Sequence, residues 1–243
     1  LRIMAGPCEF EGEIRGSIRY YSQGAVSLTG TNSTFTGNFA IHSTGGPGIT
    51  GARKIGMKGQ ASSIGSGGQI DIRENGGTLL YLGTGETTDK DFLLYPSANR
   101  SVIDGGVSGG VAFNGAWSTT GGRLVRHVIT GSHSSPCVFN GTYNEQSLNG
   151  TNYSSYLAKE GAGIWTLRNN PNRSNRGVID VRNGTLQFES IAEAGQICSL
   201  GRSDLLFADV INWNTNGFGV PYAFSLGTSS SVGTLEYIGT NSG

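Results

Sequence analysis

The feature of this chain that most constrains its fold is a long internal repeat. The octet at positions 77–84 (GTLLYLGT) recurs in similar form at 233–240 (GTLEYIGT), an offset of 156 positions (233 − 77). Upstream of it, 62–65 (SSIG) is matched by 198–201 (CSLG), and 26–28 (VSL) by 165–167 (WTL). A single unit of such a repeat usually cannot bury its apolar face without a stacked neighbour. We therefore expect one domain over residues 1–243, with about one and a half copies of a unit in which residues 25–83 and 164–239 are equivalent. We also expect the chain to be a piece of something longer.

Short runs of alternating apolar and polar residues recur along the whole chain and end at turn signals. The run 69–73 (QIDIR) stops at 74–77 (ENGG), and 178–182 (VIDVR) stops at Asn183-Gly184. Alternation with a period of two predicts strands, and Asn-Gly predicts a tight turn. Such strands would also suit a sandwich or a barrel, but the long-range repeat favours a β-solenoid. At roughly 20 to 25 residues a coil, we expect an all-β solenoid of about ten coils, whose ends present unpaired strand edges.

One stretch of the sequence resembles a known repeat. Residues 157–167 (LAKEGAGIWTL), followed by 184–188 (GTLQF), are similar to the autotransporter-associated β-strand repeat. Residues 25–37 (AVSLTGTNSTFTG) look like a second example, and 77–92 resembles the segment that often lies between such repeats. The chain departs from the family at 169–177, at 212–221 and at Cys137. The resemblance implies a right-handed parallel β-helix, in the passenger region of a large exported bacterial surface protein, and implies no catalytic residues.

Composition excludes several classes of function. Lys plus Arg and Asp plus Glu are equal at 17 each, so the chain lacks the basic excess of a nucleic-acid-binding protein. No apolar run approaches 18 residues, so we expect no membrane insertion by this segment. The three cysteines are too few and too far apart for a disulfide framework. The abundance of Gly, Ser, Thr and Asn is typical of exported proteins, and an extracellular or bacterial cell-surface location is expected.

The sequence holds few candidates for chemistry. Asp89 and Asp91 would share a strand face, as in a glycan-cleaving β-helix, but they also suit the polar start of a strand. His133 and Cys137 lie close together without a second ligand pair, so zinc is not expected. We expect no catalytic residue, no cofactor and no metal.

Aromatic residues give the better argument for binding. Trp117, Trp213 and Tyr222 lie in segments rich in Asn, Gly, Ser and Thr, and would stack on sugars if they are exposed. The alternative for the two tryptophans is packing in the core.

These observations favour a non-enzymatic extracellular scaffold or adhesive stalk. One alternative within that class is a self-assembling fibre or surface-layer subunit, which would associate through its solenoid ends. A different alternative is a β-helical polysaccharide lyase or hydrolase, which requires an acidic cluster with aromatics along one groove. Surface glycans are the remaining expected partner.

Overall fold

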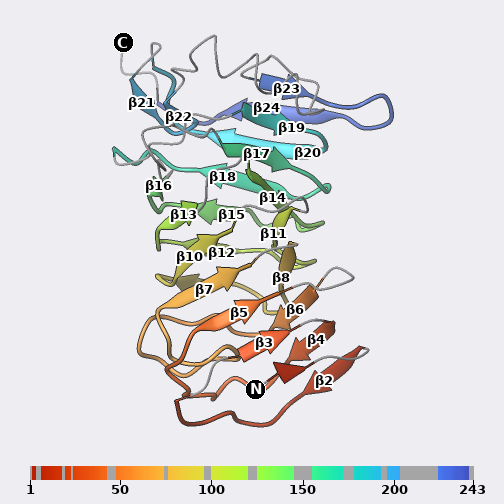
Figure 1. The fold of residues 1–243 in the computed structure, drawn as a ribbon. Coiled ribbons are helices and arrows are strands. Elements are labelled where there is room, and N and C mark those ends of the chain that lie inside the picture. Colours follow the sequence, from red (N-terminus) through yellow and green to blue (C-terminus); the bar gives the residue numbers. More distant parts are fainter. Residues whose placement is uncertain are drawn as a thin grey trace.

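The structure is a computed structural model that describes residues 2–3, 7–17, 20–22, 24–42, 48–73, 76–95, 100–119, 125–144, 155–171, 178–192, 196–202 and 224–240. These residues are all-β, and no helix occurs among them. Figure 1 shows the strands stacked as a column with the N-terminus at one end and the C-terminus at the other.

Three parallel sheets run along this column, and their neighbours come from successive coils of the chain. The nine-stranded sheet contains β2 (Cys8–Phe10), β4 (Ala25–Leu28), β6 (Gly48–Ala52), β8 (Gly77–Tyr81), β11 (Ser101–Asp104), β14 (Val125–Thr130), β17 (Ser155–Lys159), β19 (Val178–Val181) and β23 (Phe224–Leu226). The seven-stranded sheet contains β1 (Arg2–Ile3), β3 (Tyr20–Ser22), β5 (Phe39–Ile41), β7 (Gln69–Ile72), β10 (Asp91–Leu94), β13 (Trp117–Thr119) and β16 (Tyr143–Asn144). The six-stranded sheet contains β9 (Glu86–Thr88), β12 (Val111–Phe113), β15 (Cys137–Phe139), β18 (Ile164–Leu167), β20 (Gly184–Phe188) and β24 (Gly233–Tyr237).

The chain visits the three sheets in a fixed order, which makes the fold a parallel β-solenoid. From β8 in the nine-stranded sheet it passes to β9 in the six-stranded sheet, to β10 in the seven-stranded sheet and back to β11 in the first. Only the short pair β21 (Ile197–Cys198) and β22 (Gly201–Arg202) is antiparallel among the described strands. The predicted fold class is confirmed, but about ten coils was slightly too many, because the longest sheet stacks nine strands.

Alternation within each strand produces the core. In β12 and β15 the first and third residues are buried and the middle one is partly exposed. Because parallel strands in register place equivalent residues above one another, the inward positions form continuous columns. One column of the six-stranded sheet runs through Phe113, Phe139, Leu167 and Phe188. All four are buried, so the repeated coils share one apolar core.

The matched segments of the repeat take different faces of the solenoid. Strands β4 and β8 belong to the nine-stranded sheet, whereas their sequence counterparts β18 and β24 belong to the six-stranded sheet. Likewise β5 lies in the seven-stranded sheet and β19 in the nine-stranded one. The chain runs from the seven-stranded sheet to the nine-stranded sheet and then to the six-stranded sheet. Each of these strands in the second copy therefore lies one sheet further along this order than its counterpart in the first copy. The local geometry nevertheless agrees: Ser62 Oγ donates to Gly65 O at 2.6 Å, and Cys198 Sγ donates to Gly201 O at 3.2 Å.

Candidate functional site

The aromatic residues proposed for sugar stacking do not form an exposed site among the described residues. Trp117 is only 1% exposed, and its ring stacks on Phe139 with 4.1 Å between centroids. Phe92, Phe113 and Trp165 surround the same indole. Trp117 is therefore a core residue and is not available to a glycan, because it occupies an inward position of β13. Trp213 and Tyr222 lie outside the described residues.

The candidate acidic pair is engaged in bonds between coils. Asp89 Oδ1 accepts from the backbone N of Lys58 at 2.6 Å, and Lys58 Nζ lies 2.8 Å from Asp91 Oδ2. The other oxygen of Asp91 accepts from Ala116 N, in the following coil, at 2.8 Å. Glu86, which directly follows Gly85 in the same segment, accepts from two backbone amides of the preceding coil. These carboxylates hold neighbouring coils together, so the arrangement is that of a structural segment.

Two of the three histidines, His127 and His133, are buried. His127 faces inward on β14 and is 2% exposed, and complete burial lowers the pKa of its imidazole to about 3. His133 is equally buried, and its Nδ1 lies 2.9 Å from Ser135 O. Desolvation lowers the pKa of His133 as well. Both imidazoles are neutral at pH 7, and within the described part of the chain no group of three His, Cys, Asp or Glu residues could hold a metal ion.

Two buried lysines bind the backbone at corners of the solenoid. Lys159 is fully buried, and its Nζ donates to the carbonyl oxygens of Glu160, Gly161 and Asn183 at 2.7–2.9 Å. Asn183 belongs to the next coil, so the ammonium links two coils. Lys90 donates in the same way to carbonyls of Gly65 and Gly67 in the coil below. Burial lowers the pKa of each lysine to about 8, which leaves both protonated at neutral pH.

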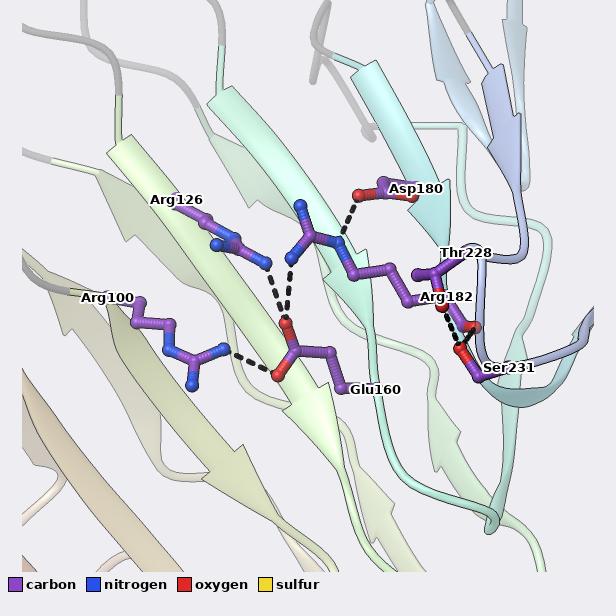
Figure 2. A network of polar contacts seen from close by, with 7 residues as sticks. All are labelled: Arg100, Arg126, Glu160, Asp180, Arg182, Thr228 and Ser231. Carbon is purple, nitrogen blue, oxygen red and sulfur yellow. Dashed lines mark hydrogen bonds and ion pairs between the residues drawn. The ribbon is translucent and has the colours of Figure 1, made fainter. Parts of the chain in front are cut away.

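The strongest cluster of exposed charge lies on the outer face of the nine-stranded sheet. Arg126 is part of β14, Arg100 precedes β11, and Arg182 follows β19. All three approach the carboxylate of Glu160, which follows β17: Arg100 Nη1 lies at 2.5 Å, Arg126 Nη2 at 2.6 Å and Arg182 Nη1 at 3.5 Å. Arg182 Nε also lies 2.5 Å from Asp180 Oδ2. Figure 2 shows the three guanidinium groups converging on Glu160 from three strands. We call these five residues the arginine cluster.

The arginine cluster is half open to solvent and carries a net positive charge. Three guanidinium groups and two carboxylates leave a formal charge of plus one. The Arg100 side chain is 48% exposed and that of Arg182 35%, whereas Asp180 is 5% exposed. Sequence reasoning missed this cluster because Arg100 and Glu160 are 60 positions apart. Whether two such distant residues meet depends on the lengths of the coils between them, and no local motif indicates those lengths.

Comparison with known proteins found a similar segment in an autotransporter adhesin. The sequence is similar to the Adhesin BmaC autotransporter of Brucella suis biovar 1 (strain 1330), with 29% identity over 214 residues. The match covers 87% of this chain and 5% of that protein, so the chain spans a small part of its relative. No family model matches the sequence, and no solved structure matches it. None of the described segments is a helix with the length and apolarity needed to span a bilayer.

Proposed function

We propose that this chain is a non-catalytic, adhesive β-solenoid segment of the passenger region of an exported bacterial surface protein. The observation that carries the proposal is the agreement between the parallel solenoid and the similarity to an autotransporter adhesin over most of the chain. The proposed mechanism of adhesion depends on the shape of the solenoid and on the side chains it displays, and involves no chemical reaction. Stacked coils with one apolar core give a rigid rod, and the side chains outside the core are displayed at fixed spacings along it.

The same architecture argues against the glycan-cleaving alternative. A glycoside hydrolase needs two carboxyl groups free to exchange protons on either side of the scissile bond. Asp89 and Asp91 instead accept bonds from backbone amides of neighbouring coils, and Asp71 and Asp180 each pair with the arginine two residues later. These carboxylates are committed to holding the fold.

An adhesion assay with an activity arm tests the proposal. Beads coated with the folded 243-residue chain should bind cultured animal cells more than beads coated with the heat-unfolded chain or with albumin. The soluble chain should release no reducing ends or unsaturated uronates from pectin, alginate or hyaluronan. Equal binding by the folded and unfolded coats would overturn the adhesive function, and glycan release would establish the enzymatic alternative.

End-to-end association is a second candidate, favoured by apolar side chains at the C-terminal end of the described solenoid. Val232 is 78% exposed and Leu226 58%, and β24 pairs through one edge only among the described strands. At the other end, Phe10 on β2 is 37% exposed. Parallel pairing between β24 of one copy and a terminal strand of the next would build a fibre. Sedimentation over a range of concentrations tests this: growing particles support it, and a constant monomer removes it.

A further inference from the structure

We infer that Asn183 is a site of spontaneous covalent modification, at which its side-chain amide cyclises onto the backbone nitrogen of Gly184 and is then hydrolysed to a carboxylate. The inference goes beyond the proposed adhesive function, because it concerns chemistry that the folded chain performs on itself. Three observations on one corner of the solenoid carry it. The two reacting groups are in contact, the pair is half-buried, and a buried ammonium binds the peptide group between the two residues.

The reaction joins the side chain of Asn183 to the nitrogen of the next residue. Solvent hydroxide removes the proton of Gly184 N, and the nitrogen attacks Cγ of Asn183. Nδ2 takes a proton from water and leaves as ammonia, which closes a cyclic imide. Water then opens the imide at either carbonyl and gives aspartate or isoaspartate. Water is the co-reactant, and nothing is oxidised or reduced.

The fold holds the two reacting groups against each other. Gly184 N donates to Asn183 Oδ1 at 2.9 Å, so the nitrogen lies beside the carbonyl carbon to which that oxygen is bonded. Contact between reacting groups lowers the barrier, because the folded chain does not have to search for this arrangement. Glycine is required at 184, since its φ is 69° and an added Cβ would lie 2.5 Å from Gly161 O. The turn therefore needs the residue whose nitrogen is the least hindered nucleophile.

Lys159 makes the Gly184 nitrogen easier to deprotonate. Its ammonium donates to Asn183 O at 2.9 Å, and this oxygen belongs to the same peptide group as Gly184 N. When the nitrogen loses its proton, negative charge spreads onto Asn183 O, where the ammonium stabilises it. Lys159 is fully buried, so water screens this interaction little. The corner therefore favours the deprotonated form that attacks.

Two other Asn-Gly pairs lie wholly within the described residues, and they serve as internal references: Asn114-Gly115 and Asn140-Gly141. Gly141 N donates to a backbone carbonyl of the preceding coil at 3.2 Å, which holds its proton. Asn114 Oδ1 accepts from Asn140 Nδ2 at 2.7 Å and not from Gly115 N. In the described part of the chain, no lysine binds the carbonyl of either asparagine. Asn183 is thus the pair that the fold prepares for reaction.

The product of the reaction changes the corner. Isoaspartate places an extra methylene in the main chain between Asn183 and Gly184, so it displaces the carbonyl that Lys159 holds. Because that hydrogen bond joins two coils, the modification should weaken the link between the coils that carry β17 and β19.

The test incubates the folded 243-residue chain in mildly alkaline buffer and follows each Asn-Gly pair by peptide mass spectrometry. We expect Asn183 to react about tenfold faster than Asn114 and Asn140, because a hydrogen bond to a charged group is worth about a factor of ten or more. In urea, where the fold is lost, the three rates should become similar. A folded chain in which Asn183 reacts no faster than the other two would overturn the inference. The same order of rates in urea would overturn it as well, since the order would then belong to the local sequence.

Two lysine variants isolate the role of the ammonium. Lys159→Met should slow the reaction at Asn183 about tenfold. Loss of stability alone would instead raise the rates at Asn114 and Asn140, which are followed in the same sample. The matched control is Lys90→Met, which removes a buried lysine at another corner and should leave the rate at Asn183 unchanged. Equal slowing by both variants, or slowing by neither, would overturn the inference.

Discussion

Replacement of Lys159 by methionine tests how the corners of the solenoid are held together. Methionine keeps the apolar stem of the side chain and removes the ammonium, which donates to three backbone carbonyls from two coils. Hydrogen bonds that involve a charged group contribute about 1.5–3 kcal/mol each, or roughly 5–9 kcal/mol for three. The desolvation of the buried ammonium, several kcal/mol, offsets much of this. We expect Lys159→Met to lower the free energy of unfolding by about 2–4 kcal/mol.

Equilibrium unfolding in guanidinium chloride, followed by circular dichroism, measures this change. In a thermal scan it corresponds to a fall in Tm of roughly 4–16 °C, from about 2–4 °C per kcal/mol in a chain of this size. The control is Lys58→Met, which removes an exposed lysine paired with Asp91 and should cost less than about 1 kcal/mol. A Lys159→Met protein as stable as the Lys58→Met protein would show that water satisfies the three carbonyls, and the bridging role of the ammonium would be refuted.

Three further changes probe the core, the corners and the buried histidine. Trp117→Ala should lower the free energy of unfolding by about 3–5 kcal/mol in urea, because it empties a fully buried site; an unchanged midpoint would contradict the core placement. Gly105→Ala puts a methyl group 2.5 Å from His133 Nε2 and should lower the free energy of unfolding by about 1–3 kcal/mol. The matched control in the same titration is Gly68→Ala, because the atoms nearest to its added methyl group lie at 3.4 Å. His127 has a pKa of about 3 when folded and about 6.5 when unfolded, so the unfolded chain binds the extra proton between these values. Stability from this group is therefore complete above pH 6.5 and falls by about 1.4 kcal/mol per pH unit below it. His127→Phe should reduce the loss of stability between pH 6.5 and 5 by about 2 kcal/mol. The same dependence of stability on pH in the variant as in the parent chain would rule this out.

Much of the local structure could be predicted from the sequence. The alternating run at 69–73 forms β7 and that at 178–182 contains β19, with the expected turn at Gly184, whose φ is 69°. The short alternating runs, each ending at a turn signal, predicted an all-β chain. These features depend on interactions between residues close in sequence, and for that reason they are visible in a single chain.

The contacts between coils could not be predicted in the same way. Glu160 meets arginines 22, 34 and 60 positions away. Coil lengths vary with the insertions at each corner, so no fixed spacing identifies such partners. The same uncertainty explains Trp117: alternation indicated that β13 has two faces, but only the stacking of coils decided which face meets the core.

The sequence by itself therefore determined the strands and the turns, because periodicity and glycine placement act locally, and its long-range repeat indicated that the strands are stacked. The tertiary structure decided which side chains are displayed. Only the winding of the coils brought three arginines to Glu160 and tied the acidic segment at 86–91 to its neighbours. It also displaced the second copy of the repeat by one face, which is possible because each face offers the same alternating inward and outward positions to a strand.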